Sequence, residues 1–207
     1  MTPAEQLAAG VAALGLELDA ARQEKLLAYL QLMAKWNRVY NLTALRSPQE
    51  WVTHHLLDSL SVLPHIRGPV VVDVGSGAGL PGLVLAMVRP DWQVISVEAV
   101  DKKAAFQRQV AAELALANVR VEGRRVEEVA LEGGADTILS RAFSSLENFV
   151  GLTRHLLKPG GVWVAMKGKL PREEMESLPH GIRVESVQEL KVPALNAERC
   201  AVLMTQV

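Results

Sequence analysis

The stretch VVVDVGSGAGLPG, from Val70 to Gly82, decides the fold of this chain. Five residues that favour a β-strand lead directly into four glycines spread over eight positions. A buried strand that ends in a glycine-rich loop and continues into a helix is typical of a nucleotide site. Glycine lets the backbone approach a ligand closely, and the helix N-terminus presents N–H groups. The stretch therefore predicts a nucleotide cradle.

The glycines fit two different ligand motifs. Gly77-x-Gly79-x-x-Gly82 matches the dinucleotide fingerprint and suggests NAD. Asp73-x-Gly75-x-Gly77-x-Gly79 matches the first motif of S-adenosylmethionine (SAM) methyltransferases. A glycine turn that binds no ligand is a third interpretation, and the loop alone leaves all three open.

Composition limits the class of protein. The 207 residues suffice for one domain or a domain with a small extension, and 49% of them are hydrophobic. A formal net charge of -1 excludes a nucleic-acid binder that depends on a global positive excess. The single cysteine and the lack of clustered His and Cys residues predict neither a disulfide nor a metal site. Without a basic leader or a long apolar stretch, the chain is expected to be cytoplasmic, with no membrane partner.

The chain divides into a helical first third and an alternating remainder. Residues 1–66 carry apolar side chains at helical spacing and predict a helical extension. Of its adjacent histidines, His54 and His55, one is expected to face the core and the other the solvent. Residues 67–207 alternate between strands and helices, which indicates a single compact α/β core with a parallel sheet. Two closing strands without a strong helix between them predict an antiparallel edge hairpin. The expected strands are 70–74, 93–97, 119–121, 135–139, 162–166, 183–190 and 199–207, with helices at 81–88, after a cap at Asp101, and at 145–157.

Glu98 ends the second expected strand, 19 residues after Gly79. A carboxylate there can accept both hydroxyls of an adenosine ribose, in NAD and SAM alike. The alternative is an acid that caps the helix beginning near Asp101.

Two further segments refine the choice of ligand. Lys158-Pro159-Gly160-Gly161 before a strand, together with the C-terminal hairpin, favours SAM over NAD. Ser140-Arg141-Ala142-Phe143 ends the fourth strand, where ligands gather in open α/β sheets. Arg141 could hold a cofactor carboxylate or donate to the substrate, and Phe143 could stack on a base. The alternative is a surface arginine and a core phenylalanine.

In combination, these segments resemble the RsmG (GidB) family of small-subunit rRNA methyltransferases. The resemblance runs in family order along nearly the whole chain. The matching segments are residues 36–44, 55–60, 73–82, 125–128, 140–143, 166–168 and 192–195. It implies a Rossmann-like class I SAM-dependent methyltransferase fold with a seven-stranded, mostly parallel sheet.

The resemblance also implies the activity: methyl transfer from SAM to N7 of a guanine in the decoding-region (530) loop of 16S rRNA, within the 30S subunit or a late precursor. S-adenosylhomocysteine would be the product, and the enzyme is expected to be a monomer. The implied cofactor-binding residues are Asp73, Gly75, Gly77, Gly79, Leu80, Glu98, Val126, Glu127 and Arg141. Substrate positioning would fall to Arg141, Lys167 and Phe143, and substrate binding to Asn41 and Arg125.

This chemistry needs few catalytic groups. Guanine N7 carries a lone pair and no proton, so neither a general base nor a metal is required, and in-line positioning suffices. Because N7 must stay free, Arg141 or Lys167 would engage O6. The alternatives are an NAD-dependent oxidoreductase, a SAM methyltransferase with another acceptor, and a non-catalytic RNA-binding protein on this scaffold.

Overall fold

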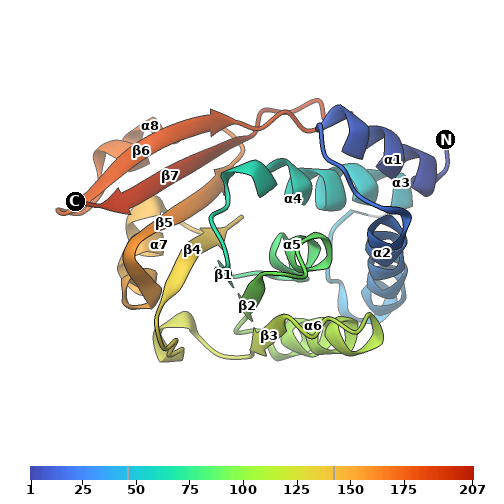
Figure 1. Ribbon diagram of the computed structural model, residues 1–207, viewed down its shortest axis with the longest axis horizontal. Helices are drawn as coiled ribbons and strands as arrows, with labels where there is room; N and C mark the ends of the chain where they lie inside the picture. The colour runs from blue at the N-terminus through green and yellow to red at the C-terminus, as the bar shows by residue number, and fades with distance from the viewer. Residues whose placement is uncertain (46, 142) are drawn as a thin grey trace.

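A computed structural model describes residues 1–45, 47–141 and 143–207; Ala142 of the Ser140–Phe143 motif lies outside the described residues. Seven strands form one sheet in the order β3-β2-β1-β4-β5-β7-β6 (Figure 1). Their bounds are β1 Val70–Val74, β2 Gln93–Val97, β3 Val119–Glu122, β4 Ala135–Ser140, β5 Leu157–Lys167, β6 Ile182–Glu189 and β7 Cys200–Gln206.

The first five strands are parallel, and β7 inserts antiparallel between β5 and β6. The register brings Asp73 opposite both Ser96 of β2 and Leu139 of β4. The predicted sheet, mostly parallel with a C-terminal antiparallel hairpin, is confirmed.

The helices differ more from the prediction than the strands. Their bounds are α1 Pro3–Ala13, α2 Ala20–Tyr40, α3 Pro48–Trp51, α4 Asp58–Ser61, α5 Gly82–Val88, α6 Asp101–Glu113, α7 Leu146–Thr153 and α8 Arg172–Glu176. Short 3-10 turns lie at Leu63–His65 (η2), Val126–Glu128 (η3) and Arg154–Leu156 (η4). A π-helix, Val52–Leu57 (η1), joins α3 to α4, and neither it nor α8 was predicted. The predicted cap at Asp101 is wrong, because Val100 is the N-cap and Asp101 is the first helical residue.

Each face of the sheet has its own helices. Val71, Val94 and Leu139 pack with Val62, which follows α4, and with residues of α5, whereas Val72 and Ile138 on the opposite face pack with α7. This alternation follows from the period-two geometry of a strand buried on both faces.

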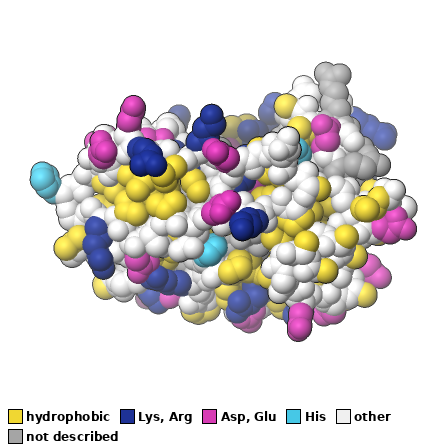
Figure 2. Space-filling model, turned by 90° about the horizontal axis from the view of Figure 1, so that it is seen from above, with side chains coloured by type: hydrophobic (Ala, Val, Ile, Leu, Met, Phe, Trp, Pro, Cys, Tyr) yellow, Lys and Arg dark blue, Asp and Glu magenta, His cyan; other side chains and the backbone are white. Residues whose placement is uncertain are grey.

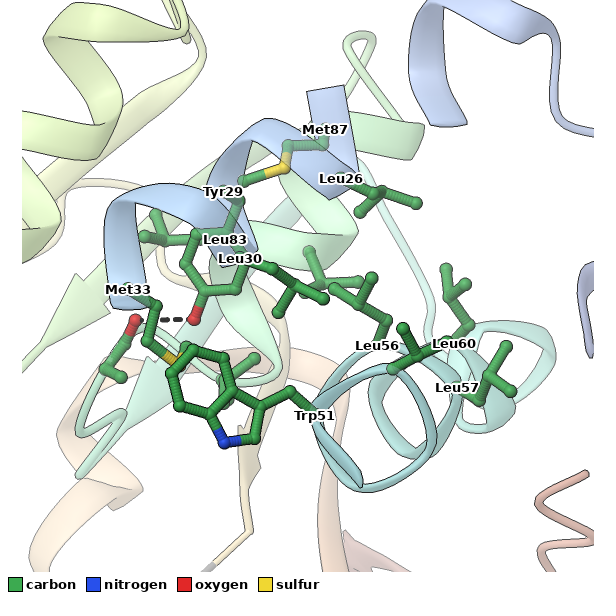
Figure 3. Close-up of a cluster of buried hydrophobic side chains, with 14 of the residues drawn as sticks. Leu26, Tyr29, Leu30, Met33, Trp51, Leu56, Leu57, Leu60, Leu83 and Met87 are labelled. Carbon is green, nitrogen blue, oxygen red and sulfur yellow. Dashed lines mark hydrogen bonds between the residues drawn. The ribbon is translucent and has the colours of Figure 1, made fainter. Parts of the chain in front are cut away.

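The N-terminal helices share a core with α5 and α6 rather than standing apart. Figure 3 shows Tyr29 and Leu30 of α2 directed toward Leu83 of α5, with Leu56 of the π-helix beside them. The Tyr29 hydroxyl donates a 2.9 Å hydrogen bond to the carbonyl of Ala78 in the glycine loop. Burial raises the pKa of this tyrosine, so its hydroxyl stays protonated as a donor. The division at residue 66 stays a prediction.

Candidate functional site

The glycine loop, residues 75–82, leaves the C-terminal end of β1 with one side open. Gly75 and Gly77 have φ angles of 67° and 60°, a left-handed conformation that residues with a Cβ rarely adopt. A Cβ at either position would have no neighbour within 4 Å. The backbone here therefore borders open space that a ligand can approach.

The N–H groups of the loop are largely used inside the protein. Gly77 N donates to Glu98 Oε2 and Gly82 N to Asp73 Oδ2, both at 2.7 Å, while Leu83 N donates to the Gly79 carbonyl at 2.8 Å. The expectation that the following helix presents free N–H groups is therefore wrong at its first two residues. Because a pyrophosphate needs such donors, this geometry disfavours the NAD interpretation.

Buried polar side chains hold the loop in shape. Ser76 Oγ accepts hydrogen bonds of 2.8 Å from Ser96 Oγ and from Gln107 Nε2, which also donates to the Gly77 carbonyl at 2.8 Å. The sequence interpretation missed Ser96 and Gln107. The available signal was a lone serine near the end of an apolar strand, opposite the loop.

Asp73 lies fully buried below the loop, with Oδ1 lacking a hydrogen-bond partner among the described residues. Burial raises the pKa of this carboxyl from 3.8 to about 7, although the Gly82 N–H and the positive charge of Arg141 oppose the rise and Glu98 adds to it. Charged side chains around the loop therefore influence the pKa of Asp73, which lies near neutral pH.

Glu98 stands at the end of β2 and is 6% exposed. Its Oε2 accepts from Gly77 N at 2.7 Å, and its Oε1 accepts from Val100 N at 2.8 Å. A carboxylate oxygen has two lone pairs, so each oxygen keeps one for a ligand hydroxyl. Glu98 ties the loop to the start of α6 without capping that helix.

A cavity of about 350 Å³, here called the loop cavity, opens beside these groups. The predicted cofactor residues that line it are Gly75, Gly77, Leu80, Glu98 and Arg141. Thr43 and His55 of the N-terminal region also line it and were not predicted to do so. The structure therefore brings together the glycine loop, the acidic strand end and Arg141.

Other predicted residues lie outside the cavity wall. Val126 is buried against the core at η3, while Glu127 and Arg125 are exposed there. Asn41 is the exposed C-cap of α2, with a left-handed φ of 49°, a conformation asparagine tolerates. Their ligand contacts stay predictions.

A second cavity of about 390 Å³, here called the arginine cavity, adjoins the loop cavity. Thr43, His55 and Arg141 line both. The arginine cavity also has Asp58, Lys167 and Arg199 in its wall. Three segments distant in sequence, near residues 55, 141 and 199, therefore meet beside the glycine loop.

Asp58 joins the two arginines of this cavity. It is only 2% exposed; its Oδ2 lies 3.4 Å from Arg141 Nη1, and its Oδ1 accepts from Arg199 Nε at 3.1 Å. Arg141 Nη1 also donates to the carbonyl of His54 in the π-helix at 3.1 Å. These contacts fix the Arg141 guanidinium between the two cavities.

His55 is the buried member of the histidine pair, and His54 is half-buried. This is close to the prediction that one histidine faces the core and the other faces solvent. Burial and the nearby Arg141 lower the pKa of His55 to about 4, so the ring is neutral at neutral pH. Its Nε2 lies 3.1 Å from Thr43 Oγ1, and Nδ1 is buried without a partner among the described residues.

Lys167 and Phe143, predicted to position substrate, already have protein partners. Lys167 Nζ pairs with Glu174 Oε2 of α8 at 2.9 Å, and the same oxygen accepts from Leu146 N. Phe143 is half-buried, with its ring 5.4 Å from that of Phe149. Lys167 lines the arginine cavity, whereas Phe143 packs mainly on the core below α7.

The described part of the chain shows neither a membrane-spanning helix nor a cluster of metal ligands. No helix there is both long and apolar enough to cross a membrane. No group of three or more His, Cys, Asp or Glu side chains within residues 1–45, 47–141 and 143–207 is placed to share a metal ion.

Sequence comparison gives relatives of the full length. The family model described as rRNA small subunit methyltransferase G matches residues 22–203. "Ribosomal RNA small subunit methyltransferase G" from Methylobacillus flagellatus is 52% identical over 200 residues, covering 97% of each chain. The protein of the same name from Aromatoleum aromaticum is 53% identical over 206 residues, covering 97% of this chain and 98% of the relative.

Solved structures show the same fold at low identity. The glycopeptide N-methyltransferase MtfA, in complex with S-adenosylhomocysteine, superposes with a TM-score of 0.63 at 11% identity, covering 74% of this chain and 87% of that one. A SAM-dependent methyltransferase from Aquifex aeolicus gives 0.56 at 24% identity, covering 73% and 91%.

Proposed function

Because the chain belongs to the family of rRNA small subunit methyltransferase G, we propose that it transfers a methyl group from SAM to N7 of a guanine in the 530 loop of 16S rRNA. The observation that carries the proposal is the shared wall of two cavities, one beside the glycine loop and one lined by arginines.

The loop cavity fits the adenosine of SAM. Glu98 keeps two lone pairs for ribose hydroxyls, and Gly75 and Gly77 leave room where a Cβ would otherwise project. Arg141 would pair with the carboxylate of the amino-acid end. Val126 and Glu127 would contact the adenine edge from η3, although they lie outside the wall of the loop cavity.

The chain's own task in catalysis is positioning. SAM would supply a methyl group bonded to a sulfonium, and the neutral thioether S-adenosylhomocysteine would be the leaving group. Since guanine N7 carries no proton, no side chain has to accept one, and the enzyme contributes alignment and exclusion of water. Arg141 is held by Asp58 and the His54 carbonyl, which supports the proposal that it would orient groups on both sides of the transfer.

The RNA partner must supply much of the binding surface itself. On the face seen in Figure 2, acidic and basic side chains are interspersed, and no broad basic field covers what is described there. This agrees with the net charge of -1. We therefore propose a folded cytoplasmic substrate, the 30S subunit or a late precursor, acted on by a monomer of this protein.

The test is radiolabelled methyl transfer into 30S subunits from a strain that lacks this gene, followed by mapping of the modified base. Label at N7 of one guanine of the 530 loop, at a higher rate with 30S than with a short naked oligonucleotide, is expected. Label at another position in rRNA would contradict the proposed acceptor and indicate a SAM methyltransferase with another acceptor. Thermal stabilisation by NAD, with none by SAM or S-adenosylhomocysteine, would overturn the proposal.

Asp73 makes SAM affinity depend on pH. A raised pKa means that the carboxyl is protonated below about pH 7, and a cationic ligand favours the ionised form. We therefore expect affinity to rise with pH, by up to about tenfold per unit, and to level off above pH 7. Calorimetry across pH 5.5 to 8.5 measures this. In the Asp73→Asn variant, SAM affinity should no longer rise with pH in this range. An identical pH profile in both proteins would show that Asp73 does not cause the pH dependence.

A further inference from the structure

We infer that the arginine cavity is the acceptor pocket, where the nucleotide carrying the target base is held and Arg199 contacts it directly. The inference rests on the proposed function and adds to it a site and residues outside the predicted set: Arg199, with Asp58 as a positioning residue and His55 in the wall.

The charge of the cavity suits a ribonucleotide. Asp58 is shared by Arg141 and Arg199, so the pair of arginines keeps a net positive charge. Lys167, in the same wall, is neutralised by Glu174. A modest positive charge in a pocket fits RNA phosphate and base oxygens better than it fits a cation or an apolar ligand.

Both arginines keep donors for a ligand. Arg199 uses Nε for Asp58 and Nη1 for the Glu198 carbonyl, and Nη2 has no partner among the described residues. Arg141 uses only Nη1, so its Nε and Nη2 are likewise unpaired within the described chain. Because N7 must remain free for methylation, the natural acceptor on guanine is O6.

His55 gives an independent sign of a ligand. The residue is 5% exposed and lines both cavities, and its Nδ1 has no partner among the described residues. A buried polar atom without a partner is costly unless a ligand or water satisfies it. A neutral imidazole there adds no charge that would repel a methyl donor.

The location also restricts the occupant. Thr43, His55 and Arg141 form the wall common to both cavities, so a base in the arginine cavity lies next to the ligand of the loop cavity. Bases in RNA loops can be splayed out of the stack and inserted into such a pocket. His55 of the π-helix and Asp58, the first residue of α4, both line the arginine cavity, and π-turns are frequent at functional sites.

The deciding variant is Arg199→Ala, compared with Arg67→Ala. Arg67 also pairs with one carboxylate, that of Glu185, but precedes β1 at the opposite end of the sheet. For Arg199→Ala we expect KM for 30S subunits to rise about 10- to 100-fold, the loss expected for a hydrogen bond to a charged group, while the Kd for SAM changes less than about twofold. Arg67→Ala should leave both unchanged.

Other outcomes overturn the inference. An unchanged KM for 30S, or a loss of SAM affinity as large as the rise in KM, would remove the acceptor role from Arg199. If Arg199→Ala does not fold, Arg199→Lys keeps the charge beside Asp58, and its KM decides in the same way. Failure of the unmodified protein to methylate 30S would instead refute the proposed function, which keeps the two failures apart.

Discussion

Replacing Glu98 with alanine is expected to weaken SAM binding at least about 100-fold. The substitution removes the proposed ribose acceptor and also the two backbone hydrogen bonds that hold Gly77 and Val100. Hydrogen bonds to a carboxylate contribute about 1.5–3 kcal/mol each, and each 1.4 kcal/mol changes affinity tenfold. Isothermal calorimetry with SAM and S-adenosylhomocysteine measures the loss.

Glu128→Ala is the matched control, because Glu128 is an exposed acid at η3 beyond the loop cavity. It should bind SAM as the unmodified protein does. Thermal unfolding without ligand separates a lost ligand contact from a disordered loop. A Glu98→Ala protein that binds SAM normally would remove the ribose role from this residue.

The second large effect is expected for Gly82→Ala. A Cβ at Gly82 would lie 2.7 Å from Asp73 Oδ2 and 2.8 Å from Asp73 Cβ, and Asp73 is fixed at the end of a buried strand. Either strand or helix has to shift, which also breaks the 2.7 Å hydrogen bond between Gly82 N and Asp73. Crowding and the lost bond together should cost about 3 kcal/mol. That lowers Tm by roughly 6–12 °C and abolishes SAM binding with it.

Gly151→Ala provides the opposite expectation. Gly151 lies in α7, where an added Cβ would have no neighbour within 4 Å. Alanine there should stabilise the protein by about 0.5–1 kcal/mol, since glycine in a helix loses more backbone entropy. Differential scanning calorimetry of both variants checks the contrast; a Gly82→Ala protein as stable as Gly151→Ala would show that the contact with Asp73 is not restrictive.

The sequence predicted the sheet well because its signals are local. Val70–Val74 and Gln93–Val97 have the predicted bounds, since short apolar runs between glycine, proline and polar residues specify buried strands. The sequence showed Gly82 only as the last glycine of the dinucleotide fingerprint; its close approach to Asp73, nine residues earlier, becomes visible in three dimensions.

The sequence predicted the part of the candidate site whose residues follow a known spacing. It missed the part formed by residues from segments distant in the chain. Glu98 and the glycine loop belong to adjacent strands and follow a recurring spacing. His55 comes from the π-helix, Asp58 begins α4 directly after it, and Arg199 precedes β7, the antiparallel strand inserted between β5 and β6. Helical periodicity does not show a change from α to π geometry, and charge patterns do not show which arginines share a carboxylate.

The hydrogen bond from Tyr29 to the Ala78 carbonyl connects the N-terminal helices to the glycine loop. Through it, the stability of these helices is expected to contribute to the free energy of ligand binding. A ligand that rigidifies the loop must also stabilise α2, and by reciprocity any change that loosens α2 must lower the affinity of the loop. We therefore expect the first helices to act as an energetic partner of the proposed cofactor site, through a contact between residues 49 positions apart in the chain.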